Sequence, residues 1–173
     1  MVLAAFLFKS CLLPFGGAIG EDMMKLNQFT DIGLRTLIYL TQPERALPFT
    51  IRQVAAELLV SSHHLVKVVN FMAKQGWIVT ARGHNGGIGL SRSPAEYRLG
   101  TVIRTLEERG NNSYQLVNCH SMACPLRSNC NLNTILHGAV NVFTEHLEQY
   151  TLADAVRDPQ SLGTLIRVHM VNS

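Results

Sequence analysis

The sequence lacks the signatures of several large protein classes. It contains no internal repeat, no low-complexity segment and no apolar run of the ~20 residues that a membrane helix needs. Charged residues make up only 16% of the chain and hydrophobic residues 47%, which argues against a disordered chain and allows a buried core. No nucleophile–base pair and no phosphate-binding loop can be recognised, so we expect no enzyme.

An N-terminal leader, residues 1–23, stands apart from the rest of the chain. Its apolar stretch, residues 2–13, is interrupted by Lys9, is preceded by no positive charge and is followed by no small-x-small cleavage site. Patterned sequence begins near Met24. We therefore expect the leader to be spurious, from an upstream start site, or disordered; a true extension or a cloning remnant is the alternative. We expect a cytoplasmic protein without membrane contact.

Positive charge is concentrated in one part of the chain. Residues 24–100 carry nine Lys or Arg against four Asp or Glu, whereas residues 101–173 carry five against six. A basic segment in a chain of net charge +3 is expected where a protein faces phosphates, although an ordinary solvated surface gives the same count.

Two helix starts are visible early in this basic segment. Thr30 is expected to cap a first helix that ends near Leu40. Thr50 and Gln53 have the spacing of a capping box, which predicts the start of a second helix. A turn of about three residues then leads to a third helix, as in the DNA-binding helix-turn-helix.

The third helix and a hairpin complete the pattern. The helix begins at Ser61 or Ser62 and ends at Gly76, a residue type that favours the position after a helix end. Its apolar positions are Leu65, Val68, Val69 and Met72. Strand-like runs follow on either side of Gly83-His84-Asn85-Gly86-Gly87, whose Asn-Gly pair favours a hairpin turn. Three helices followed by such a wing predict a winged helix-turn-helix.

This motif predicts which side chains read DNA. The N-terminal residues of its second helix reach base edges in the major groove, and wing glycines let the backbone approach a phosphate or the minor groove. The predicted DNA-binding residues are Arg52, Ser61, Ser62, His63, His64, Lys67, Arg82, His84, Asn85 and Gly86. The alternative for His63 and His64 is that they are ordinary surface residues beside a helix cap.

Three of the four cysteines, Cys119, Cys124 and Cys130, lie close together in a loop of residues 111–131. Three cysteines cannot pair off as disulfides without one left over, and thiolates bind iron or zinc. The spacing is neither the C-x2-C pair of zinc sites nor the ferredoxin run. The cysteine loop therefore has three possible interpretations: an iron–sulfur cluster, a zinc site, or thiols that are redox-active or inert. A cluster needs a fourth ligand from elsewhere.

The last long helix has apolar residues that recur every three or four positions. They are Leu132, Ile135, Leu136, Ala139, Val140, Phe143, Leu147 and Tyr150. We expect this stripe to pack against a second copy of the chain; packing onto its own domain is the alternative. Thr151 is expected to cap a short final helix.

The predicted fold is mainly α with a small β-wing: a winged helix-turn-helix with a long dimerisation helix. Residues 24–100 form the DNA-binding domain, and residues 101–131 a connecting helix and the cysteine loop. Residues 132–158 hold the dimerisation helix and the short final helix, and residues 159–173 a tail.

Taken together, several segments resemble the NsrR/IscR family of winged-helix iron–sulfur transcriptional regulators over about residues 24–158. They are MKLNQFTDIGLRTLIYL, the helix-turn-helix, RGHNGGIGL, the three cysteines and YTLADAV. The resemblance implies a homodimer joined through the long helix, with a 2Fe–2S or 4Fe–4S cluster on Cys119, Cys124 and Cys130. In some members an Asp from the partner subunit is the fourth ligand, and it matches Asp31. The alternative for Asp31 is a first-turn residue favoured by the helix dipole.

The resemblance also implies a function. The expected protein is a repressor that binds double-stranded operator DNA and releases genes against nitrosative stress when nitric oxide attacks the cluster. One alternative is a related regulator that senses cluster supply or redox state. Another is a small metal-binding or electron-carrier protein without DNA binding, against which the basic winged segment argues. His84 stands where related wings often carry Lys, so phosphate attraction there is expected to be weaker.

Overall fold

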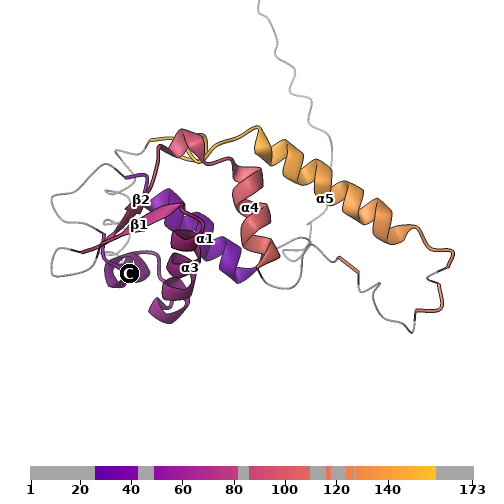
Figure 1. The fold of residues 1–173 in the computed structure, drawn as a ribbon, viewed down its shortest axis with the longest axis horizontal. Coiled ribbons are helices and arrows are strands. Elements are labelled where there is room, and N and C mark those ends of the chain that lie inside the picture. Colours follow the sequence, from indigo (N-terminus) through magenta and orange to yellow (C-terminus); the bar gives the residue numbers. More distant parts are fainter. Residues whose placement is uncertain are drawn as a thin grey trace, which may run out of the picture.

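The computed structural model describes residues 26–42, 49–81, 86–109, 116–117, 124–126 and 128–158 (Figure 1). Within these residues the chain forms α1 (Gln28–Tyr39), α2 (Ile51–Glu57), α3 (Ser62–Lys74), β1 (Ile78–Thr80), β2 (Ile88–Leu90), the 3-10 helix η1 (Pro94–Glu96), α4 (Leu99–Glu108) and α5 (Leu132–Glu148). The predicted fold class, mainly α with a small β-wing, is confirmed. None of these helices combines the length and apolarity needed to cross a bilayer.

Helix α1 begins earlier than predicted, because Asn27 and not Thr30 caps it. The Asn27 side chain accepts a hydrogen bond from the backbone N–H of Thr30 at 2.9 Å, as an N-cap residue does. The side chain of Thr30 is fully buried. Asp31 lies in the first turn of α1, as the sequence analysis expected.

Helices α2 and α3 form the helix-turn-helix. Thr50 caps α2 as predicted, accepting from the backbone N–H of Gln53 at 3.2 Å. The Gln53 side chain donates instead to Glu57 at 2.8 Å, so only one half of the predicted capping box forms. The predicted apolar face of α3, which consists of Leu65, Val68, Val69 and Met72, is buried. Gly76 follows α3 with a φ of 69°, a conformation that glycine adopts without strain.

The wing is a two-stranded antiparallel sheet in which Ile78 pairs with Leu90 and Thr80 with Ile88. Ile78 and Ile88 turn into the core, whereas Val79 between them is 57% exposed. A bridge from Phe49 to Ile88 joins the wing to the residues before α2. Helices α1, α2 and α3 with β1 and β2 are called the winged domain below, and their apolar faces share one core.

The predicted short final helix is wrong: residues 151–155 form a turn. The Thr151 backbone and hydroxyl donate to Asp154 at 2.8 and 2.7 Å, and these bonds lower the pKa of the Asp154 carboxyl. The Leu152 N–H donates to the carbonyl of Tyr97 at 2.9 Å. Leu152 is completely buried in the core of the winged domain. Its burial and the bond to Tyr97 anchor the chain after α5 in this turn.

Helix α4 lies between the winged domain and α5 (Figure 1). A Cβ atom built at Gly100 would lie 2.4 Å from the carbonyl oxygen of Thr144 and 2.8 Å from the backbone nitrogen of Glu148. Glu148 in turn accepts the backbone N–H of Thr101 at 2.6 Å and its hydroxyl at 2.8 Å. The start of α4 therefore touches the end of α5 backbone to backbone.

Gly100→Ala is expected to destabilise the protein by about 1–3 kcal/mol, because the new methyl group meets backbone atoms that cannot rotate away. Gly89→Ala is the control, since a Cβ there would meet only the Val79 side chain, at 3.9 Å. It should be neutral or stabilising by about 0.5–1 kcal/mol. Denaturant unfolding of the metal-free protein measures both. Equal stability of the two variants would contradict the close approach of α4 and α5.

The turn between α2 and α3 contains a strained residue. Leu59 has a φ of 54° and is 66% exposed. The left-handed conformation costs a residue with a Cβ roughly 1–2 kcal/mol. This cost is larger than the small burial energy that an exposed leucine contributes.

Leu59→Gly is therefore expected to raise the free energy of unfolding by about 0.5–1 kcal/mol, after the extra freedom of glycine in the unfolded chain is subtracted. Leu58→Gly provides the control, because Leu58 has a φ of −88° and is half-buried. It should be destabilised. The prediction is wrong if both variants lose stability in thermal unfolding.

Candidate nucleic-acid interface and metal ligands

Helix α3 presents an exposed polar face opposite its buried one. Ser61, Ser62, His63 and Lys67 all lie on the surface, where they were predicted to meet DNA. His63 and Lys67 are four residues apart and so share one side of the helix. Their imidazole and ammonium groups can donate to base edges or phosphate oxygens.

The same face carries residues that the sequence analysis missed. Asn70 and Lys74 are exposed and continue the row at helical spacing from His63 and Lys67. Val66, 40% exposed, lies beside them. An asparagine amide can pair with adenine and an apolar side chain can contact a thymine methyl group, so both types suit a major groove. Asn70 lies three residues after Lys67, and Lys74 lies four residues after Asn70. This helical spacing was the signal in the sequence that could have identified them.

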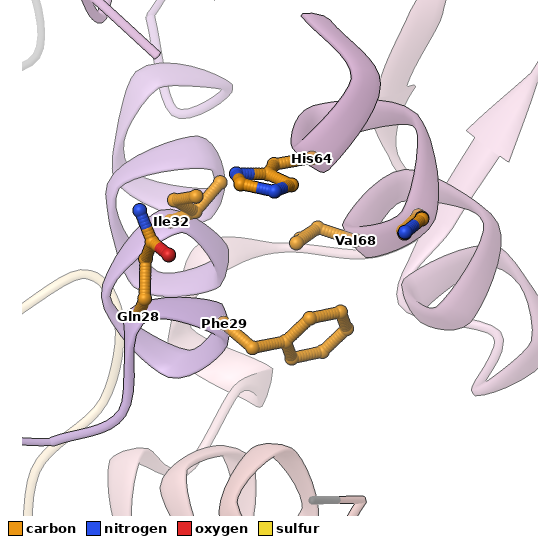
Figure 2. A pocket seen from close by; sticks show the side chains of 6 residues that line it. Gln28, Phe29, Ile32, His64 and Val68 are labelled. Atoms are coloured by element: carbon orange, nitrogen blue, oxygen red, sulfur yellow. The ribbon is translucent and has the colours of Figure 1, made fainter. Parts of the chain in front are cut away.

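His64 lies at the edge of this face and contributes to a small pocket between α3 and α1. Gln28, Phe29, Ile32, His64, Lys67 and Val68 line it. Figure 2 shows His64 across from Ile32, with Phe29 facing Val68 on the lower side. The pocket therefore lies between the first turns of α1 and the N-terminal half of α3.

The remaining predicted DNA contacts are divided between described and undescribed residues. Arg52 is exposed in the first turn of α2. Gly86 is half-buried just before β2. Arg82, His84 and Asn85 lie outside the described residues, so their contact with DNA stays a prediction.

Two of the three clustered cysteines fall within the described residues. Cys124 is half-buried, Cys130 is exposed, and both are free thiols. Cys130 lies directly before Asn131, the N-cap residue of α5. Cys119 lies outside the described residues. Among those that are described, no group of three His, Cys, Asp or Glu comes together to hold a metal ion.

Asp31, the predicted fourth ligand, forms an ion pair with Arg35 one turn further along α1. The Arg35 Nε donates to the Asp31 carboxylate at 2.9 Å. The Asp31 side chain is 43% exposed and that of Arg35 51%. Exposed pairs at this spacing contribute only about 0.3–0.5 kcal/mol, so a metal can take the carboxylate at small cost. Soft thiolates with one carboxylate are a donor set that fits iron.

Comparison with known proteins gives consistent matches. Residues 26–158 match the family model Rrf2, described as an iron-dependent transcriptional regulator. The HTH-type transcriptional regulator NsrR of Geobacillus kaustophilus (strain HTA426) is 39% identical over 147 residues, which span 83% of this chain and 97% of that protein. The expectation that the chain is no enzyme is confirmed by these regulators.

Two solved structures share the fold. The IscR structure from T. potens is 20% identical, with a TM-score of 0.60 over 82% of this chain and 93% of its own. CymR (YrzC), the global cysteine regulator of B. subtilis, is 23% identical, with a TM-score of 0.57 over 77% of this chain and 96% of its own.

Lys67→Ala is expected to weaken binding to all DNA sequences alike, because an ammonium group on the exposed face of α3 neutralises a phosphate. The slope of log affinity against log salt should fall in magnitude by about one. Arg104→Ala, which removes an exposed charge from α4 instead, is the control and should leave the slope unchanged. Anisotropy titrations of labelled DNA at several salt concentrations measure both. Identical slopes for the two variants would remove Lys67 from the interface.

Proposed function

Because this chain belongs to the Rrf2 family of transcriptional regulators, we propose that it is a homodimeric repressor that releases operator DNA on sensing nitric oxide. The observation that carries the DNA-binding half of the proposal is the exposed row of His63, Lys67 and Asn70 on α3. The sensing half is supported by the relative named NsrR and by the three clustered cysteines with Asp31.

In the proposed complex α3 enters the major groove. Ser62 and His63 lie at its N-terminal end, where side chains of a recognition helix meet base edges. Lys67 contacts a phosphate, and Arg52 on α2 contacts the backbone beside the site. The wing, which carries Arg82, is proposed to follow the groove alongside.

A second copy of the chain is proposed to cover the outer face of α5. Val140 and Thr144 are the buried residues of this helix, and they face α4. The apolar side chains left exposed are Leu132 at 47%, Ile135 at 62%, Val142 at 67% and, just after the helix, Tyr150 at 43%. An apolar face of this kind, unpaired in the monomer, suits an isologous contact. The two-fold axis would then set two α3 helices apart at the spacing of two half-sites.

The residues proposed to hold an iron–sulfur cluster are Cys119, Cys124 and Cys130, with Asp31 of the partner subunit as fourth ligand. A bound cluster supplies iron that reacts with nitric oxide. Asp31 would leave Arg35 in order to coordinate, and its carboxylate would return to Arg35 when released. A carboxylate is a harder and weaker donor to iron than a thiolate, so Asp31 would be the ligand that is displaced most easily.

Nitric oxide is expected to lower operator affinity about 5–150-fold, the usual range of coupling between two sites. The measurement is an anaerobic titration of cluster-loaded protein, with operator binding followed by anisotropy. Cys124→Ala should lose the cluster and with it the response, whereas Cys11→Ala, outside the cysteine loop, should keep both. Iron and sulfide analysis confirms the loading of each variant.

The outcomes also separate the alternatives. Unchanged affinity on nitric oxide addition rejects the proposed signal. If loaded and metal-free protein nevertheless differ in affinity, the chain is a regulator of the kind that senses cluster supply. A cluster-loaded chain that binds no DNA in a gel shift on its own upstream sequence would be a carrier protein.

A further inference from the structure

The guanidinium of Arg109 lies over two aromatic rings at the C-terminal end of α4. Its central carbon is 3.9 Å from the ring centre of Phe29 on α1 and 5.2 Å from that of Phe71 on α3. Both distances are within the ~6 Å at which a cation is attracted to the face of a ring. One charged group of α4 therefore contacts the first helix and the recognition helix together.

The two rings are part of a row that reaches the wing. Phe29 and Phe71 meet edge to face with their centres 5.6 Å apart. Phe71 and Trp77 meet in the same way at 6.4 Å. Trp77 is buried and directly precedes β1. The row Phe29–Phe71–Trp77, with Arg109 at one end, thus touches α1, α3 and the base of the wing.

A second contact joins the same end of α4 to α1. The carboxylate of Glu107 accepts a hydrogen bond at 3.0 Å from the backbone N–H of Asn27, the N-cap residue of α1. Glu107 is 8% exposed, so this bond is shielded from water. The last turn of α4 therefore fixes the start of α1, in whose first turn Asp31 lies, and also contacts α3.

The place of Arg109 in the chain gives these contacts a functional meaning. Arg109 is the C-cap residue of α4, and the segment that carries Cys119 follows it. We propose that Arg109 is a positioning residue for DNA reading: it holds α3 and the base of the wing in register with α4 through the aromatic row. This inference rests on the proposed function for the DNA-binding role of α3. It assigns to Arg109 no contact with DNA or metal.

The test uses the only tryptophan of the chain, Trp77, as a probe of the full-length, metal-free protein. Arg109→Met removes the charged guanidinium and keeps an unbranched, flexible stem. It should increase quenching of Trp77 fluorescence by acrylamide, because the row loses the group at its end. Arg109→Lys keeps the charge and should restore most of the protection. Arg104→Met, at an exposed arginine of the same helix, should behave as the unaltered protein.

A second readout is the ratio of operator affinities of cluster-loaded and metal-free protein. Arg109→Met should reduce this ratio by about fivefold, the lower end of the usual range of coupling between two sites, with far-ultraviolet circular dichroism unchanged. Trp77 quenching and an affinity ratio that match those of Arg104→Met would overturn the proposal. A ratio of one in the unaltered protein would reject the proposed sensing function. Trp77 quenching and the operator affinity of metal-free Arg109→Met would then decide alone whether Arg109 positions α3.

Discussion

The arrangement of the molecule depends on the close approach of α4 to α5 at Gly100, where two helix backbones touch without a side chain between them. At the other end of α4, Glu107 accepts the backbone N–H of Asn27, the N-cap residue of α1, and Arg109 contacts α1 and α3. A single short helix therefore links the long helix, which we propose to form the dimer, to the helix that we propose to read DNA. Because packed helices deform little, a shift at one end of α4 is carried to the other.

This linkage explains how ligands at a distance can act on DNA reading. Cys130 precedes α5, and Asp31 lies in the first turn of α1, so the proposed ligands sit at the ends of elements that α4 joins. The exposed pair of Asp31 and Arg35 is weak enough to exchange for a metal. The pocket between α1 and α3 lies beside the first turn of α1, which carries Asp31. In this account the DNA-reading geometry has two positions, and coordination selects one of them.

Sequence reasoning succeeded where local pattern decides the structure. The buried face of α3 follows from its apolar spacing, and the whole winged fold follows from its turn and cap residues. It failed where contacts between residues far apart in the sequence decide the structure. Asn27 and Thr30 are both good caps, and the bond from Asn27 to Glu107 on α4 favours the earlier start. The turn at Leu152 replaces a helix because the core takes in that side chain. On α5 the pattern could not tell which side faces α4, since a stripe suits any apolar neighbour.

Amide hydrogen exchange tests the central claim most directly, because it compares the protein with and without the cluster that we propose it binds. The account predicts that loading slows exchange in the first turn of α1 and in α3, while the contact of α4 with α5 exchanges equally slowly in both forms. Equal exchange of α1 and α3 in the two forms would contradict it, since coordination would then leave unchanged the helix that we propose to read DNA.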